Sequence, residues 1–312
     1  MKISVIIPVY NAEKYVTQAV ASALQFDEVY EVVLVEDKSP DNALQVCREL
    51  AGKHSRVKLY QHPDQGNHGA GASRNLGIEK SEGDFISFLD ADDYYLPNRF
   101  DAEKELFKNN DVDGVYGAIG VHYYSEKAKE QYYKVFGDRL TTVYKKHPPK
   151  DVFPGQLNMI GTFGLFSIDA LTIRKSSLKN LQYFFKTHLK LHQDTEFLFR
   201  LSYYLNLYPG ILDSAVAVRG VHENNRITKV DNREIKPAST RVLLWEEVNK
   251  WAESENTIPA EIKLHIRRVY RSFQIANAPF ITKWGMILKY MFTDYRSIRS
   301  GLYNINFRKD LF

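Results

Sequence analysis

Short apolar runs alternate with helical patterns through the first hundred residues. This alternation of expected strands and helices is compatible with only a few folds. The apolar runs are expected to form strands at 3–9, 32–35, 57–60 and 85–89. Apolar side chains recur at helical spacing after Asn11, which we expect to cap the first helix, after Pro40, and over Ala70–Ile78. Continuous apolar runs indicate strands that are covered on both faces. The chain is therefore predicted to be an α/β protein with a parallel sheet.

The remainder of the chain shows a weaker pattern. The elements expected there are a helix after residue 97, strands at 112–116 and 165–173, and a helix at 195–205. The segment 117–160 is not assigned. From about Lys236 the pattern becomes helical. The sequence thus predicts one domain over 1–228 and a separate helical extension over 236–312.

Composition limits the classes of partner that the protein can bind and the cellular compartment in which it is expected. Lys and Arg number 42 against 38 Asp and Glu, so no general binding of nucleic acid is expected. The single Cys47 cannot form an internal disulfide, which favours a reducing compartment. We expect no leader peptide, and the sequence has no run of ~18 apolar residues that would span a membrane. We expect a cytoplasmic protein that at most touches the inner face of a membrane.

Polar residues follow the expected strands at the points where they end. They are Tyr10, Asp37, Gly66, Gly69, Asp90, Asp92 and Asp93. The carboxyl ends of parallel strands meet at one edge of a sheet, where such folds bind ligands. The three clustered carboxylates raise one another's pKa unless a positive charge neutralises them. Because carboxylate oxygens suit Mg²⁺ or Mn²⁺, the cluster predicts a metal-assisted site for a phosphorylated ligand.

Each of these residues also has a structural alternative. Tyr10 is either a half-buried core tyrosine or a flat surface for a nucleobase. Asp37 belongs either to an ordinary turn or to a site where it accepts a hydrogen bond from a base or ribose. The glycines either shape a turn or let backbone N–H groups approach an anion. Arg74 is a solvated surface arginine, or else it neutralises a phosphate or holds the acidic cluster.

Four segments carry a specific resemblance to a known family: 4–11, 35–41, 67–77 and 83–93. In order and spacing they resemble the family 2 glycosyltransferases, inverting enzymes of the GT-A fold. The resemblance is specific over 1–100 and weaker to about residue 228. It implies a Rossmann-like, mixed but mostly parallel sheet flanked by helices. It also implies that 1–100 binds a nucleotide-sugar and that 101–228 binds the acceptor.

The resemblance assigns roles to residues of these segments. The residues implied for the nucleotide-sugar site are Pro8, Tyr10, Asn11, Asp37, Gly69, Arg74, Asp90 and Ala91. Tyr10 would stack on the base, with Pro8 shaping the backbone beside it. Asp37 would hydrogen-bond the base, typically uracil. Asp90 would contact the ribose or the sugar, and Arg74 would face the diphosphate or the sugar.

The metal and the general base rest on the same resemblance. Asp92 would ligate Mn²⁺ or Mg²⁺ on the diphosphate. Asp194 matches the family's general base, but Gln193 stands where a Glu is usual, so Glu196 is the alternative base. The structural alternative for Asp194 is capping of a helix. His222 would be a further metal ligand or a phosphate contact, although a lone histidine is more often structural.

The predicted function is metal-dependent transfer of a sugar from a UDP-linked donor to an acceptor hydroxyl, in the synthesis of a cell-surface polysaccharide or lipid-linked glycan. One alternative is a non-catalytic nucleotide-sugar binder, which need not keep Asp194. Another is a haloacid-dehalogenase-like phosphatase, whose motif has Thr or Val where this chain has Tyr94. Basic and aromatic side chains interleave over Lys283–Lys309, which predicts either peripheral membrane contact or a homodimer contact.

Overall fold

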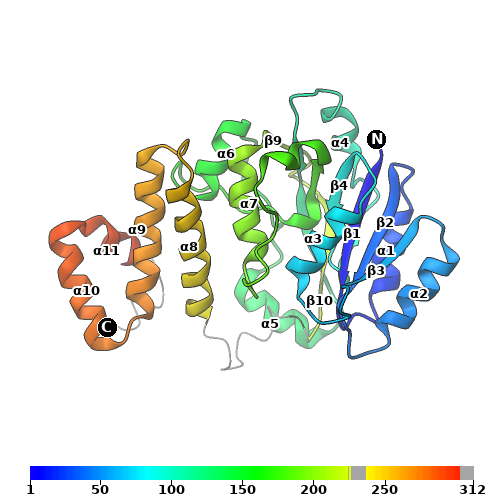
Figure 1. The fold of residues 1–312 in the computed structure, drawn as a ribbon, viewed down its shortest axis with the longest axis horizontal. Helices are drawn as coiled ribbons and strands as arrows, with labels where there is room; N and C mark the ends of the chain where they lie inside the picture. Colours follow the sequence, from blue (N-terminus) through cyan, green and yellow to red (C-terminus); the bar gives the residue numbers. More distant parts are fainter. Residues whose placement is uncertain (224, 226–236, 303–312) are drawn as a thin grey trace. The chain divides into compact units, whose positions relative to one another are not determined.

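The fold is built on a seven-stranded mixed sheet, seen in a computed structural model that describes residues 1–223, 225 and 237–302 (Figure 1). The strand order is β3-β2-β1-β4-β8-β6-β9. The strands are β1 Ile3–Val9, β2 Val29–Glu36, β3 Val57–Gln61, β4 Phe85–Phe88, β6 Gly114–Tyr116, β8 Leu171–Arg174 and β9 Leu207–Pro209. All neighbours pair in parallel except β8, which is antiparallel to β4 and β6. The predicted mixed, mostly parallel α/β fold is confirmed.

The chain divides into two compact units. The first comprises Met1–His188 and Phe197–Lys229, and the second comprises Leu189–Glu196 and Val230–Phe312. The large sheet belongs to the first unit. The predicted roles of 1–100 and 101–228 stay predictions.

Helices cover both faces of the large sheet. They are α1 Val16–Leu24, α2 Ala43–Lys53, α3 Ala70–Lys80, α4 Asp101–Leu106, α6 Pro149–Gln156 and α7 Gln193–Tyr204, whereas α5 Glu126–Phe136 packs on a second, smaller sheet. Successive side chains of a strand point to opposite faces. Val5 of β1 therefore packs in one cluster with Val20 of α1, whereas Ile6 packs in another with Ile78 of α3 and Phe197 of α7. This double burial explains why the strand sequences are continuously apolar.

A smaller sheet lies beyond the acidic segment. Its strands, in spatial order, are β5 Tyr94–Tyr95, β10 Ala215–Val221 and β7 Ala118–Tyr123. β10 is antiparallel to β5 and parallel to β7. Helix α5 packs on this sheet through Ala128 and Tyr132, which cluster with Val221. Because β5 directly follows Asp93, the pairing brings the end of β10 next to the acidic residues.

Two predictions about the ends of elements are wrong. Asn11 does not cap the first helix, because α1 begins at Val16. Asn11 instead adopts a φ of 55°, and its N–H donates to Ser39 Oγ at 3.2 Å. The strand expected at 165–173 begins only at Leu171, because a 3-10 turn over Ile168–Ala170 precedes it. In both places a local polar contact or turn replaces the regular element that the apolar pattern indicates.

The second unit is helical. Its helices are α8 Pro237–Ser254, α9 Ala260–Asn277, α10 Phe280–Thr293 and α11 Tyr295–Leu302. Asp294, between α10 and α11, accepts from Arg268 at 2.9 Å and from Arg271 at 3.1 Å, which ties this corner to α9. Within the described ranges, no helix has the length and apolarity needed to cross a membrane. The basic and aromatic residues predicted beyond Leu302 lie outside the described residues.

Candidate active site

The carboxyl ends of β1, β2 and β4 meet at one edge of the large sheet. In the pairing register Val9 of β1 lies beside Glu36 of β2, and Ile6 of β1 lies beside Phe88 of β4. The segments that follow these strands therefore leave the sheet at the same edge, where ligands bind in such folds. They contain most of the residues that the sequence singled out.

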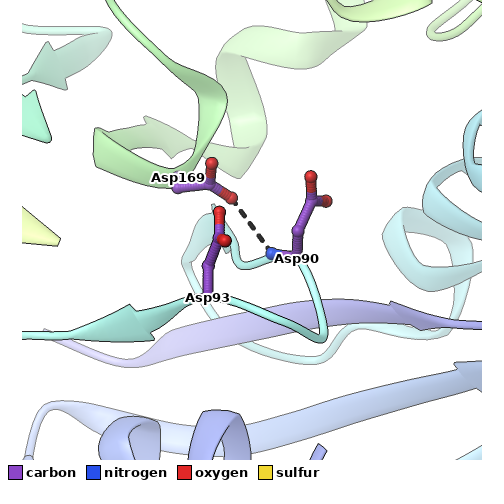
Figure 2. Close-up of side chains that lie close together, drawn as sticks. All are labelled: Asp90, Asp93 and Asp169. Carbon is purple, nitrogen blue, oxygen red and sulfur yellow. Dashed lines mark hydrogen bonds between the residues drawn. The ribbon is translucent and has the colours of Figure 1, made fainter. Parts of the chain in front are cut away.

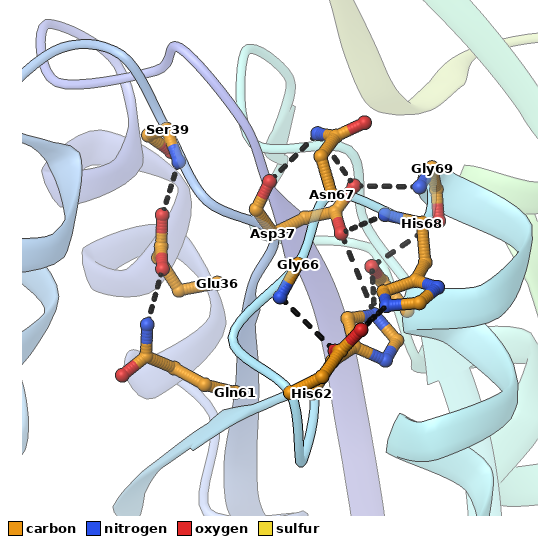
Figure 3. Close-up of polar contacts among 11 residues, drawn as sticks. Glu36, Asp37, Ser39, Gln61, His62, Gly66, Asn67, His68 and Gly69 are labelled. Atoms are coloured by element: carbon orange, nitrogen blue, oxygen red, sulfur yellow. Dashed lines mark hydrogen bonds and ion pairs between the residues drawn. The ribbon is translucent and has the colours of Figure 1, made fainter.

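Asp37 fixes the loop that leads into α3 (Figure 3). Its buried carboxylate accepts from the N–H groups of His68 and Gly69, each at 2.7 Å, and from Asn67 Nδ2 at 3.1 Å. Asn67 Nδ2 also donates to the carbonyl oxygen of Asp37 at 2.7 Å. A carboxylate offers about four lone-pair positions, and three are occupied here. The structural role of Asp37 is thus to hold the loop, while its contact with a base stays a prediction.

The neighbouring residues of the predicted donor site differ in exposure. Pro8 is buried within β1, beside Val35 of β2. Tyr10, just beyond the strand, is 50% exposed, so its ring is accessible to a planar ligand. Gly69 has a φ of 85°, which disfavours other residue types, although a Cβ there would meet nothing within 4 Å. The loop before α3 therefore needs glycine for its backbone conformation.

Arg74 and Asp90 form an ion pair. Arg74 Nη2 donates to Asp90 Oδ1 at 2.5 Å, and the guanidinium lies over the ring of Phe185, 5.5 Å from its centroid. Arg74 is buried in α3, whereas the carboxylate of Asp90 is partly exposed. The structure therefore places Arg74 as a partner of the acidic cluster. Its contact with a phosphate stays a prediction.

Asp93 and Asp169 are buried beside Asp90 (Figure 2). Carboxylate oxygens of the three residues lie within 4.8 Å of one another. Asp169 Oδ1 accepts from the N–H of Asp90 at 3.0 Å, and Asp93 Oδ1 accepts from the N–H of Gly220 at 2.8 Å. Burial, reinforced by the neighbouring carboxylates, raises the pKa of Asp93 well above its usual range and that of Asp169 to about 6. These carboxyl groups are costly to ionise without a positive neighbour.

Arg219 is that positive neighbour. It lies on β10 and donates to Tyr132 Oη at 3.4 Å. Burial works to lower the pKa of the Arg219 guanidinium, but the carboxylates of Asp93 and Asp169 outweigh burial and raise it. The buried acids are therefore balanced within the protein, by Arg219 and by Arg74.

Asp92 and His222 come together at the end of β10. Asp92 Oδ2 lies 3.1 Å from His222 Nε2 and accepts from Asn225 Nδ2 at 2.9 Å. Tyr15 stacks on the imidazole, with ring centroids 4.6 Å apart and planes at 18°. A Cβ at Gly220 would lie 2.0 Å from the carbonyl oxygen of Asp92, so this close approach requires glycine.

The carboxylates at this edge can hold a divalent cation, and two donor sets are present. Asp90, Asp93 and Asp169 have oxygens close enough for a shared ion, and each of them, like Asp92, already accepts or pairs with a protein group. Asp92 and His222 have side chains that are 29% and 14% exposed. A carboxylate with an imidazole suits Mn²⁺ better than Mg²⁺, which prefers oxygen ligands.

Asp194 lies at the start of α7, in the short stretch that belongs to the second unit. Its side chain is exposed, and its Oδ1 accepts from the N–H of Thr195 at 2.8 Å. Glu196, the alternative base, is fully buried. Only Asp194 of these two acids is accessible to an acceptor, and its role as the base stays a prediction.

The sequence assigned no role in the site to Asp169, Arg219 or Tyr15. Asp169 comes far after the acidic segment, and only the pairing of β8 with β4 brings it close. Arg219 precedes His222 in the same short segment. Because clustered carboxylates need a cation nearby, an arginine in this segment could have been considered as their partner. Tyr15 stacks on a residue some two hundred positions later, which no local pattern indicates.

Comparison with known proteins shows to which family the chain belongs. A sequence model described as Glycosyl transferase family 2 matches residues 4–173, more than half of the chain. The chain belongs to glycosyl transferase family 2. Its resemblance to this family is thereby confirmed, and the alternative of a haloacid-dehalogenase-like phosphatase is excluded.

Relatives of this family 2 member share part of its sequence or its fold. An uncharacterized glycosyltransferase of Haemophilus influenzae is 37% identical over 116 residues, which cover 37% of this chain and 46% of the relative's length. TarS 1-349 of Staphylococcus aureus in complex with UDP-GlcNAc matches with a TM-score of 0.62 and 21% identity, over 88% of this chain and 72% of that one. Mannosyltransferase PcManGT of Pyrobaculum calidifontis, in complex with GDP-Man and Mn²⁺, matches with a TM-score of 0.55 and 14% identity, over 98% and 85%. At these identities the two structures establish the fold alone.

Proposed function

We propose that this glycosyltransferase moves a sugar from a UDP-sugar to an acceptor hydroxyl, with inversion at the anomeric carbon. The proposal rests on the convergence of an accessible aromatic ring, a buried arginine and a row of carboxylates at one sheet edge, inside the segment that matches the family. To bind a nucleotide-sugar, a site needs an aromatic surface for the nucleobase, cations for the diphosphate and hydrogen-bond acceptors for the sugar. The UDP-GlcNAc bound to TarS supports the choice of nucleotide.

We assign the divalent cation to Asp92 and His222. Their facing atoms are 3.1 Å apart, both side chains reach solvent, and Tyr15 orients the imidazole by stacking on it. When bound there, Mn²⁺ or Mg²⁺ would offset the charge of the leaving diphosphate. The Mn²⁺ bound to PcManGT supports the use of a divalent cation.

The protein's own groups perform the remaining steps. Arg74, held by Asp90, stabilises negative charge on the diphosphate side. Tyr10 stacks on the base and so orients the donor. Asp194 takes the proton of the acceptor hydroxyl, because it is the exposed acid of the two candidates. The acceptor is proposed to be a cell-surface polysaccharide or a lipid-linked glycan.

The assignment of the base is tested with Asp194→Asn, and with Asp101→Asn as the matched control. Asp101 is an exposed acid in the first turn of α4, so its replacement removes the same charge from a comparable place. We expect Asp194→Asn to slow transfer by about 10²–10⁴-fold, the usual contribution of a general base, without weakening UDP binding measured by calorimetry. The control variant should transfer at the wild-type rate. Transfer by Asp194→Asn at that rate would show that another group is the base.

A further inference from the structure

The helix α10 has an exposed apolar face that the proposed chemistry does not use. Among the described residues, seven of the sixteen exposed large apolar side chains lie between residues 280 and 295. Those in α10 are Phe280, Ile281, Trp284, Leu288, Met291 and Phe292, which we call the α10 stripe. With 3.6 residues per turn they fall within a sector of about 120° around the helix. They therefore form one continuous surface.

The α10 stripe is separate from the face through which α10 packs on its neighbours. Ile287 is buried and clusters with Ile275 of α9, and Tyr290 packs against the same cluster. Ile281 and Phe292 of the stripe are 86% and 81% exposed. A helix with apolar side chains on both its packed and its exposed face needs a second apolar partner. Exposed apolar patches of this kind mark interaction sites.

Positive charge is concentrated in the part of the sequence that contains the α10 stripe. Between residues 260 and 300 the sequence has eight Lys and Arg residues against two acids, whereas the whole chain has a surplus of only four. Of these cations, Arg268 and Arg271 are paired with Asp294, Arg267 is paired with Glu253, and Lys283 is buried. Lys289, on α10, and Arg296, on α11, are exposed. The partner of this surface should therefore be apolar in part and negatively charged.

We propose that the α10 stripe docks this unit onto a membrane surface that contains anionic lipids. The apolar side chains would enter the boundary between headgroups and acyl chains, and the basic residues would lie against lipid phosphates. Trp284 and Tyr295 suit this boundary, because aromatic rings with a polar edge concentrate there. A second copy of the chain fits less well, because it would bring two basic surfaces together. The proposal does not depend on the donor or the acceptor of the transfer reaction.

Sedimentation of the full-length protein with lipid vesicles tests the proposal. The vesicles are phosphatidylcholine alone, or the same lipid with about one part in three of phosphatidylglycerol. Wild-type protein is compared with the double variant Ile281→Ser, Phe292→Ser, and with the control Tyr144→Ser, Leu165→Ser. The control removes two apolar side chains that are also exposed, at 67% and 64%, but lie in the first unit.

We expect the wild-type and control proteins to sediment with the anionic vesicles and the α10 double variant to bind at least about tenfold more weakly. Added salt should release the wild-type protein, because headgroup attraction is screened. Equal binding by the α10 variant and the control would overturn the proposal, as would equal binding to the two vesicle types. The proposal would also be overturned if the wild-type protein formed a dimer that bound no vesicles, and if the α10 variant could not form that dimer. Unchanged thermal unfolding midpoints of both variants show that neither effect comes from misfolding.

Discussion

Asp37, Asp92 and Asp93 lie at the same sheet edge but are held in three different ways. Asp37 accepts three protein donors and fixes a loop. Asp93 is buried and is balanced by Arg219. Asp92 is partly exposed and faces His222. Burial and hydrogen-bond partners, and not residue type, therefore separate the carboxylates that support the site from the one best placed to bind a ligand.

The support given by Asp37 can be measured with Asp37→Asn and the control Asp64→Asn. The amide of the variant turns an N–H group toward the N–H donors of His68 or Gly69, so a buried hydrogen bond is lost. The free energy of unfolding, measured in urea, should fall by about 1–3 kcal/mol. Asp64 accepts from the same loop, at Gly66 N, but its side chain is 64% exposed, so its variant should change stability by less than about 0.5 kcal/mol. Equal losses in the two variants would contradict the structural role given to Asp37.

The sequence could predict those site residues whose position follows from one strand end. Tyr10, Asp37 and Asp92 each come directly after an apolar strand, and parallel strands put these ends together. Asp169 could not be found in this way, because it lies in a turn before an antiparallel strand. Its place depends on a pairing between distant segments, which local patterns do not determine.

At the scale of elements, α3 lies against β1 at very short distance. A Cβ on Gly77 would lie 2.3 Å from Ile6 Cγ2, whereas a Cβ on Gly52 of α2 would meet nothing within 4 Å. The contact sets the position of α3, which carries Arg74 and begins at the loop held by Asp37. The two helical glycines thus form a natural pair for comparison.

Alanine substitution should have opposite effects at the two glycines. We expect Gly77→Ala to lower the free energy of unfolding by about 1–3 kcal/mol, because the added methyl overpacks the helix–strand contact. Gly52→Ala should raise it by about 0.5–1 kcal/mol, because alanine favours the helix and finds space. Urea midpoints measure both changes. Stabilisation by Gly77→Ala would show that α3 can move away from β1.

Elements were predictable where burial on both faces makes a strand continuously apolar, as in β1, β2 and β4. The segment 117–160 could not be assigned because β7 is only partly buried and its partner β10 comes a hundred residues later. Pairing across the smaller sheet, and not local propensity, determines this part of the fold.

At the scale of the whole molecule, the two units differ in charge and in composition. The first contains the sheet edge with its carboxylates and the segment that matches the family. The second carries the chain's surplus of positive charge and the α10 stripe. We expect binding of the donor to depend on the first unit, and attachment to a surface to depend on the second.

Release of nucleoside diphosphate from a panel of UDP-sugars and GDP-sugars tests the central claim most directly. The wild-type protein and Asp92→Asn are each measured with Mn²⁺ and with EDTA. We expect Mn²⁺-dependent release of UDP from a UDP-sugar by the wild-type protein, lost in EDTA and reduced at least about a hundredfold in Asp92→Asn. Release at the same rate in EDTA, or full activity of Asp92→Asn, would contradict the metal assignment. The sugar passes to water or to a glycan acceptor added to the assay. Binding of UDP without release from any donor, with or without these acceptors, would contradict the proposed transfer itself.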